Sequence, residues 1–289
     1  MSLPLTVLIA AKDEAVNLPR CLDALSPAER VVVLDSHSTD GTPDIARDHG
    51  AEVVQFDYDG GYPKKRQWAL DTLDIQTRWT LLLDADEIVP EELWDEIRRT
   101  LDAPSDDAYL ITKGFHFMGK AFRFGGFSHE AILLFRTGTA RFEQLIEDPA
   151  DALDMEVHER VHVDGTVGRL ETPLIHEDYK GLEAYLNRHN QYSTWEARLR
   201  RAYLQNDTYG ENSVEADLFG NAQERRRFLK KIAIQVPFEP LLWFLYHYLF
   251  RLGILEGRPG FIASRIRAGY IANVRAKMYE LEKDDRGVE

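Results

Sequence analysis

Leu81-Leu82-Leu83-Asp84-Ala85-Asp86-Glu87 is a short apolar run that ends in acidic residues. This pattern predicts a buried strand that carries its acids at its carboxyl end. Side chains two positions apart in a strand point the same way, so Asp84 and Asp86 can converge on one cation. Hard cations such as Mg²⁺ or Mn²⁺ prefer carboxylate oxygens. The alternative is a solvated turn before a helix expected at Pro90-Glu91-Glu92, because acids are favoured near any helix N-terminus.

Strand-like and helix-like segments alternate through the sequence that precedes this run. We expect strands at Leu5–Ala10, Arg30–Asp35, Glu52–Phe56 and Trp79–Asp84, with helical patterns at Leu18–Leu25, Thr42–His49 and Lys64–Leu73. The alternation predicts an α/β fold with a mainly parallel sheet flanked by helices. Ligands of such sheets bind beyond the carboxyl ends of the strands. Asp13, Asp35, Asp84 and Asp86 all fall at those ends, which predicts an acidic cleft there.

The rest of the chain divides into a β-rich part and a helical part. Residues from Ala108 to Ile175 are rich in strand and turn signals and follow without a linker, so we expect them to continue the first domain. Helical spacing begins after Tyr179. We therefore predict a domain at residues 1–180 and a helical C-terminal extension at residues 181–289.

Composition excludes several classes of protein. The net charge of −14 argues against general nucleic-acid binding. The single Cys21 excludes an intramolecular disulfide framework and suits a reducing compartment. Residues 1–11 lack the basic start and cleavage signal of a signal peptide, so we expect a cytoplasmic location.

Three ordered motifs resemble family 2 inverting glycosyltransferases of the GT-A fold. They are Leu5 to Glu14, Val33 to Thr42, and Leu82 to Glu87. The chain is most similar to the WaaE-like lipopolysaccharide-core and exopolysaccharide glycosyltransferases, which also carry counterparts of Val157-His158-Glu159, Ile175-His176 and a basic and aromatic tail. The resemblance implies transfer of a sugar from a nucleotide-sugar donor, UDP-sugars being favoured, to a lipid-linked glycan or lipopolysaccharide-core acceptor.

The resemblance also implies roles for single residues at the strand ends. Carboxylates are pure acceptors, which suits contacts with base N–H groups and ribose hydroxyls. Basic side chains at a helix start suit phosphate, although a solvated basic helix start is an equal alternative for Lys64, Lys65 and Arg66. The residues expected to bind the donor are Ala11, Asp13, Glu14, Asp35, Lys65, Arg66, Asp84 and Ala85.

A metal site and a catalytic base follow from the same resemblance. Asp86 and His176 are expected to bind Mg²⁺ or Mn²⁺, although a lone histidine after a strand is often structural. Glu159 is expected to be the general base that deprotonates the acceptor hydroxyl, with Glu130 and Glu87 as the next choices. The alternative is that Glu159 simply pairs with Arg160 or Arg169.

Two departures from the family pattern concern the donor and acceptor pockets. His37 stands where the family usually has glycine. The segment Gly125-Gly126-Phe127-Ser128-His129-Glu130 replaces the subgroup's Gly-Gly-Trp-Tyr-Pro-Asp. The identity of the sugar is therefore left open. Two other functions are alternatives to sugar transfer. One is a sugar-nucleotide pyrophosphorylase, which needs a Gly-rich basic loop after its first strand that Ala11-Lys12-Asp13-Glu14 does not supply. The other is a catalytically silent nucleotide-sugar-binding module.

The C-terminal tail combines basic and aromatic residues. Residues 225–283 hold 12 Lys or Arg against 4 Asp or Glu. Their apolar run, Leu241–Phe250, is ten residues long, whereas a bilayer span needs about 20. Basic residues beside Trp and Tyr favour an interfacial helix on anionic lipid. We therefore expect peripheral association with the inner face of the bacterial cytoplasmic membrane, the alternative being a core helix covered by the catalytic domain.

Overall fold

The computed structural model describes residues 2–144, 160–206, 218, 219, 228, 236 and 238–285. The chain forms two compact units. Unit 1 comprises residues 1–121, 128–142 and 152–181, and unit 2 comprises residues 122–127, 143–151 and 182–289. Glu159 and the basic residues 225–227, 230 and 231 lie outside the described residues.

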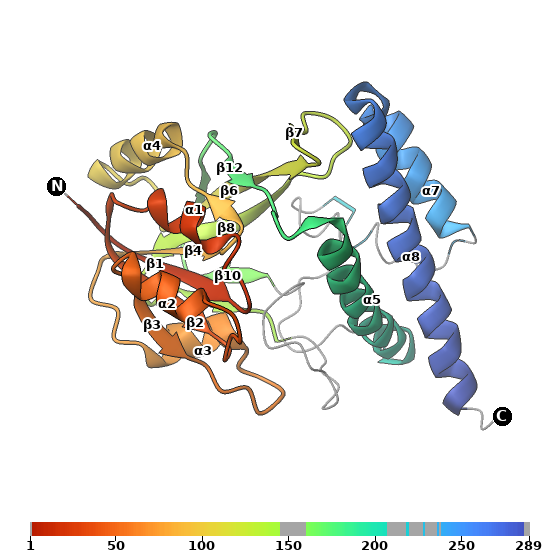
Figure 1. Ribbon diagram of the computed structural model, residues 1–289, viewed down its shortest axis with the longest axis horizontal. Helices are drawn as coiled ribbons and strands as arrows, with labels where there is room; N and C mark the ends of the chain where they lie inside the picture. The colour runs from red at the N-terminus through yellow and green to blue at the C-terminus, as the bar shows by residue number, and fades with distance from the viewer. Residues whose placement is uncertain are drawn as a thin grey trace. The chain divides into compact units, whose positions relative to one another are not determined.

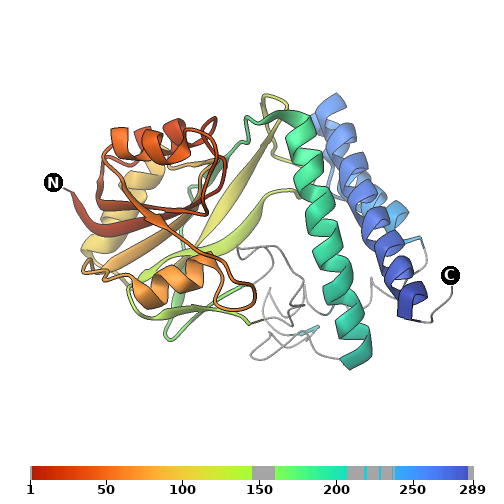
Figure 2. The same cartoon turned by 60° about the horizontal axis from the view of Figure 1, so that its bottom comes forward.

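Unit 1 begins with four parallel strands and three helices (Figure 1). The strands are β1 (Leu3–Ala11), β2 (Ala28–Asp35), β3 (Glu52–Gln55) and β4 (Trp79–Asp84), in the order β3-β2-β1-β4. Helices α1 (Leu18–Asp23) and α2 (Thr42–Asp48) cover one face of the sheet, and α3 (Lys65–Thr72) covers the other (Figure 2). The chain adds strands in one direction from β1 to β3 and then returns to place β4 on the other side of β1. Because parallel crossovers are right-handed, this change of direction puts α3 on the opposite face from α1 and α2.

Strand register brings the predicted cleft residues together at one edge of the sheet. Ala11 of β1 lies opposite Asp35 of β2, and Ala10 lies opposite Asp84 of β4. The apolar residues Leu81, Leu82 and Leu83 are buried, as expected for a strand covered on both faces. The acids of the two neighbouring strands therefore end at the same level on either side of β1.

The second half of unit 1 extends the sheet with mixed strand directions. It contains α4 (Glu91–Asp102) and the strands β5 (Glu87–Ile88), β6 (Ala108–Phe117), β7 (Lys120–Ala121), β8 (His129–Arg136), β9 (Ala140–Phe142), β10 (Val161–Val163), β11 (Val167–Arg169) and β12 (Leu174–His176). The described sheet continues β4-β8-β6-β12-β5, with β8 antiparallel to both neighbours, whereas β9 and β10 pair in a separate two-stranded sheet. This is the α/β class that the sequence predicted, with a mainly parallel first half.

Unit 2 is helical and has its own small core. Its described elements are α5 (Gly181–Asn206), α7 (Glu239–Leu245), a π-helical turn η1 (Tyr246–Phe250), a 3₁₀ turn η2 (Gly253–Glu256) and α8 (Arg258–Asp285). Helices α5 and α8 run side by side in both ribbon views (Figures 1 and 2) and share a core of Ala197, Tyr270, Ile271 and Val274. Among the described helices, none is both long and apolar enough to cross a membrane.

Candidate active site

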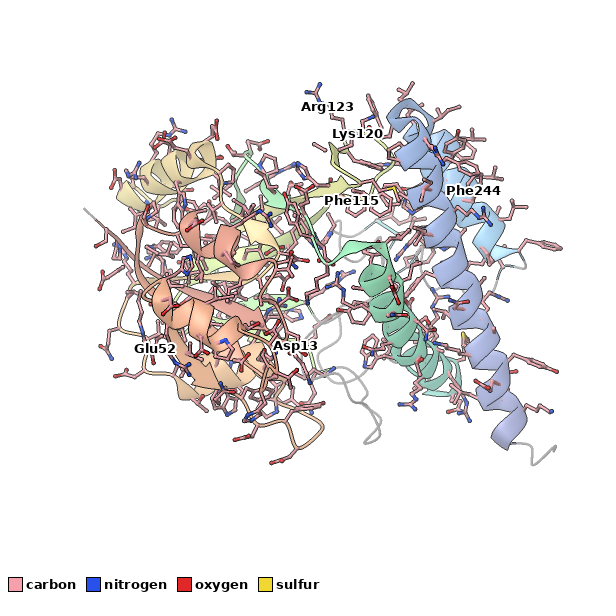
Figure 3. The ribbon with its side chains drawn as sticks, in the orientation of Figure 1. Asp13, Glu52, Phe115, Lys120, Arg123 and Phe244 are labelled. Carbon is pink, nitrogen blue, oxygen red and sulfur yellow. The ribbon has the colours of Figure 1, made fainter. Side chains whose placement is uncertain are left out.

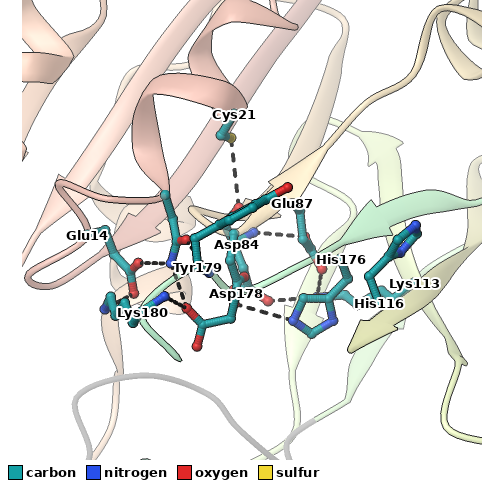
Figure 4. A network of polar contacts seen from close by, with 12 residues as sticks. Glu14, Cys21, Asp84, Glu87, Lys113, His116, His176, Asp178, Tyr179 and Lys180 are labelled. Carbon is teal, nitrogen blue, oxygen red and sulfur yellow. Dashed lines mark hydrogen bonds and ion pairs between the residues drawn. The ribbon is translucent and has the colours of Figure 1, made fainter. Parts of the chain in front are cut away.

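The end of β4 carries a buried cluster of opposite charges (Figure 4). Lys113 of β6 places Nζ 2.8 Å from Oδ2 of Asp84 and 2.6 Å from Oε1 of Glu87. Arg66 of α3 pairs with the other oxygen of Asp84, and the backbone N–H of Asp84 donates to Glu87 Oε2 at 2.8 Å. Asp84 is thus held in place by two cations from two different elements.

Burial and these cations set the charge states of the cluster. Burial raises the pKa of Asp84, but Arg66 and Lys113 outweigh it and hold that pKa well below its usual value. For Glu87, which is 0% exposed, burial dominates over Lys113 and raises the pKa. The pKa of Lys113 is raised, because its two carboxylate neighbours outweigh its burial. These effects favour the ionised forms of both Asp84 and Lys113.

Asp86 is oriented differently and meets His176, the last residue of β12. Nε2 of His176 lies 3.3 Å from Oδ2 of Asp86. Burial lowers the pKa of His176, but Asp86 outweighs that effect and raises the pKa to about 9. The two side chains come together because β12 pairs with β5, His176 lying opposite Glu87. Sequence reasoning placed both residues in one metal site, and the structure brings them together.

This pair of side chains suits a divalent cation. A carboxylate oxygen and an imidazole nitrogen are both metal ligands, and Mg²⁺ or Mn²⁺ retains water and takes substrate phosphate oxygens in its other positions. Two protein ligands are therefore enough for a cation that is bound together with a nucleotide. Over the described residues, no group of three or more His, Cys, Asp or Glu residues is arranged to hold a metal without a nucleotide.

The ends of β1 and β2 form a second part of the site. Asp35 is 0% exposed, and its carboxylate accepts hydrogen bonds from the backbone N–H and the hydroxyl of Ser38. The backbone N–H of Asp13 donates to Ser38 Oγ at 2.8 Å, and Asp13 Oδ1 accepts from the N–H of Thr39 at 2.7 Å. The two loops therefore hold each other at the edge where the sheet ends.

Glu14 joins the first strand to the segment after β12. Nζ of Lys180 lies 2.6 Å from Oε1 of Glu14, and Nδ2 of Asn17 donates to Glu14 Oε2 at 2.8 Å. Asn17 also donates to Asp178 Oδ1 at 3.0 Å and accepts from the N–H of Tyr179 at 2.8 Å. Burial raises the pKa of Glu14, with Lys180 opposing it. These contacts hold the segment that leaves His176 against the end of β1 (Figure 4).

The basic residues at the start of α3 point into the protein. Lys64 and Lys65 are each 1% exposed, and Lys65 Nζ donates to the backbone oxygen of Ala11 at 2.9 Å. Arg66 is bound to Asp84. The solvated helix start that the sequence left open does not describe these three side chains. They lie among the predicted donor residues, with Lys65 bound directly to Ala11.

The candidate bases differ in their surroundings. Glu159 lies outside the described residues. Glu87 is buried and bound to Lys113, which disfavours it as the base. Oε1 of Glu130 on β8 lies 2.8 Å from Nη2 of Arg169. Arg169, one of the two alternative partners of Glu159, is thus already paired with a carboxylate.

The departures from the family pattern also have a structural setting. His37 has a φ of 52°, in the left-handed region that favours glycine, and its Nε2 lies 2.6 Å from Asp57 Oδ1. The loop after β2 thus holds a side chain there at the cost of some backbone strain. Residues 125–127 of the second departure pack within unit 2.

Sequence reasoning missed Lys113 and Lys180, which bind acids of the site. Lys113 is 7% exposed inside a largely apolar strand, and a lone lysine in such a strand is a signal of a buried ion pair. Lys180 follows a turn and carries no such signal.

Comparisons with known proteins identify relatives of this chain. The sequence model of the family described as "Glycosyl transferase family 2" matches residues 6–151. The lipopolysaccharide core biosynthesis glycosyltransferase LpsC of Rhizobium meliloti (strain 1021) is 28% identical, over 96% of this chain and 93% of its own length. Glycosyltransferase RT0209 of Rickettsia typhi (strain ATCC VR-144 / Wilmington) is 25% identical, over 98% of this chain and 89% of its own. The crystal structure of S. aureus TarS 1-349 in complex with UDP-GlcNAc is 15% identical and has a TM-score of 0.45, with 99% of this chain and 92% of that chain covered.

Proposed function

Because the chain belongs to glycosyl transferase family 2 and is a glycosyltransferase, we propose that it moves a sugar from a nucleoside-diphosphate sugar, UDP-sugars being favoured, to a growing lipopolysaccharide core or another lipid-linked glycan. The similarity to LpsC over most of both chains supports this acceptor class. Family membership favours transfer over the pyrophosphorylase and the silent module. The observation that carries the proposal is the pairing of Asp86 with His176 beside the ends of β1, β2 and β4.

In the proposed mechanism the strand ends bind the donor nucleotide. The carboxylates of Asp13 and Asp84 would accept hydrogen bonds from N–H groups of the base and from ribose hydroxyls. The buried Asp35 would hold the Ser38 loop in place beside them. Arg66 and Lys113 keep Asp84 ionised and fix its orientation, which prepares it as an acceptor before the donor arrives.

The departing nucleoside diphosphate gains negative charge as its bond to the sugar breaks. Asp86 and His176 would hold a divalent cation, which stabilises that charge as a Lewis acid. For His176 to bind a cation, its proton must leave, and the raised pKa that Asp86 causes makes binding compete with protonation. We propose Glu159 as the base that takes the acceptor proton, on the resemblance of Val157-His158-Glu159 to the family motif.

The metal site can be tested by calorimetric titration of UDP in Mn²⁺ and in EDTA. We expect wild-type protein to bind UDP at least about tenfold more tightly with Mn²⁺, since a cation held by Asp86 would also attract the diphosphate. Asp86→Asn should lose this enhancement and bind as weakly as wild type does in EDTA. The exposed Asp48, at the end of α2, provides the matched control, and Asp48→Asn should behave as wild type. Enhancement that persists in Asp86→Asn would remove Asp86 from the metal site.

A further inference from the structure

Helix α7 and turn η1 present an apolar stripe to solvent. Their exposed side chains recur at helical spacing, at positions 238, 241, 242, 246, 249 and 250. The opposite side carries Glu239, Trp243 and His247, spaced four apart, and Glu239 and His247 are buried. Amphipathic helices of globular proteins normally turn their apolar side inward. Here the polar residues face inward and the large apolar residues face out.

Contacts on the inward side fix this orientation. Arg200 of α5 places Nη1 2.9 Å from Glu239 Oε1. His247 Nδ1 donates to the backbone oxygen of Gly125 at 2.6 Å, and its ring stacks on Phe127 with centroids 4.7 Å apart. Rotation of the helix to bury its apolar stripe would break a buried ion pair and this hydrogen bond, which is costly.

Exposed apolar side chains continue beyond the helix and into a neighbouring loop. Leu252, Ile254 and Leu255 around η2 are 46%, 48% and 58% exposed. Glu256 accepts hydrogen bonds from the backbone N–H groups of Arg123 and Phe124, both at 2.7 Å, so the loop at residues 122–127 is held beside η2. We call the combined surface the apolar ridge; it consists of Phe124, Phe238, Leu241, Leu242, Tyr246, Leu249, Phe250, Leu252, Ile254 and Leu255.

Within residues 238–275, the exposed charged side chains are all cationic. Every residue from 238 to 275 is described, and its two acids, Glu239 and Glu256, are 1% and 3% exposed. Arg251, Arg258 and Arg265 are exposed, as is Arg123, which extends away from the ribbon in Figure 3. Exposed acids first appear at Glu280, 22 residues along α8 from Arg258, which is about 33 Å at the helical rise.

We propose that the apolar ridge and its four arginines insert into the headgroup region of an anionic lipid surface. Apolar side chains rimmed by arginine match an interface that is apolar below and anionic above. A second copy of the chain fits less well, because a twofold contact would bring arginine-rich rims together. The proposal deepens the membrane association expected from the sequence by assigning it to described residues, and it does not rest on sugar transfer.

Vesicle sedimentation tests the assignment. Wild-type protein is mixed with vesicles of phosphatidylcholine alone, or of phosphatidylcholine with phosphatidylglycerol, in the absence of donor and acceptor. We expect binding to the anionic vesicles that weakens with salt. The variant Phe250→Ser/Leu255→Ser should lose at least about tenfold in affinity. Both side chains are more than half exposed in the free protein and would be buried when the ridge inserts into lipid. Tyr279→Ser, which removes a 71% exposed aromatic near the other end of α8, is the control and should bind as wild type.

Charge variants separate the two parts of the surface. Each arginine near an anionic surface contributes about fivefold in affinity, so Arg258→Gln/Arg265→Gln should lose about 25-fold on anionic vesicles and little on neutral ones. Absence of wild-type binding to anionic vesicles would overturn the proposal. So would a dimer in light scattering that Phe250→Ser/Leu255→Ser converts to monomer, because the ridge would then be an interface between copies. Either result leaves the proposed transfer reaction standing.

Discussion

Lys113 is the residue on which two buried carboxylates depend. Its Nζ lies within 2.8 Å of both Asp84 and Glu87, and removal of the ammonium group leaves Glu87 buried without its cation. Removing one partner of a buried ion pair typically costs about 3–5 kcal/mol. We therefore expect Lys113→Met to lower the free energy of unfolding by that amount, measured by urea denaturation. The same variant should bind UDP more weakly, because Asp84 loses one of its two orienting cations.

A second substitution distinguishes a charge effect from a packing effect. Glu87→Gln removes the unpaired charge and keeps an acceptor for the N–H of Asp84, so Lys113→Met/Glu87→Gln should recover most of the lost stability. If the double variant is no more stable than Lys113→Met, the loss comes from packing and not from the buried carboxylate.

The positions of the site residues were easier to predict than their partners. Asp13, Asp35 and Asp84 could be placed at one edge from sequence, because parallel strands are continuous apolar runs with their polar exits at the same end. The partners of Asp84 come from α3 and β6, and pairing across such distances depends on sheet order. The apolar runs do not encode the pairing of β12 with both β5 and β6, which places the strand of Lys113 one strand away from that of Glu87.

The loop at residues 122–127 is held in place by contacts with the C-terminal helical elements. Its backbone is held by Glu256 through Arg123 and Phe124, and by His247 through Gly125. We expect Glu256→Ala to speed hydrogen exchange of the Arg123 and Phe124 amides at least about tenfold, since hydrogen bonds to a charged acceptor contribute about 1.5–3 kcal/mol each. Exchange measured by mass spectrometry over this peptide checks the prediction.

The conservative change supplies the control for that experiment. Glu256→Gln keeps an acceptor oxygen at the same reach and should raise the exchange rates less than Glu256→Ala does. Unchanged rates in both variants would mean that the loop is held without Glu256.

Element boundaries followed the sequence closely in unit 1 and less so in unit 2. The helical pattern at Lys64–Leu73 became α3 at Lys65–Thr72, and the acids after Pro90 begin α4. For the run Leu241–Phe250, sequence could not show which side faces solvent, because an almost continuous apolar run has no polar face. Contacts with α5 and the loop at residues 122–127 decide that, and both are distant in sequence.

The two units have separate cores, one in the sheet and one among the C-terminal helices. We therefore expect two transitions in calorimetric unfolding. A ligand stabilises only the unit that binds it, so UDP with Mn²⁺ at 100 times its Kd should stabilise the unit 1 transition by about 2.7 kcal/mol and leave the other in place. Equal shifts of both transitions would show that the units unfold together.

Acid should act on the other unit, through His247. The pKa of His247 is lowered to about 4, mainly by burial and also by the nearby Arg267 and Arg251, although the hydrogen bond to Gly125 opposes them. In the unfolded chain, the pKa of a histidine is near 6.5. Between these two values the unfolded chain binds a proton that the folded unit does not. Stability of unit 2 is therefore complete above about pH 6.5 and falls as the pH drops toward 4, by on the order of 2 kcal/mol.

His247→Asn isolates this effect from the titration of other groups. The side-chain amide of Asn can donate to Gly125 as Nδ1 of His247 does, but it does not ionise. The variant also loses the ring stacking with Phe127, which lowers its stability equally at every pH. The measurement is the free energy of unfolding of the unit 2 transition, for wild type and for His247→Asn, from pH 7 to pH 4.5. The difference between the two proteins should shrink by on the order of 2 kcal/mol as the pH falls. A difference that stays constant over this range would mean that His247 titrates alike in the folded and unfolded chain, and that its burial does not control the acid sensitivity of unit 2.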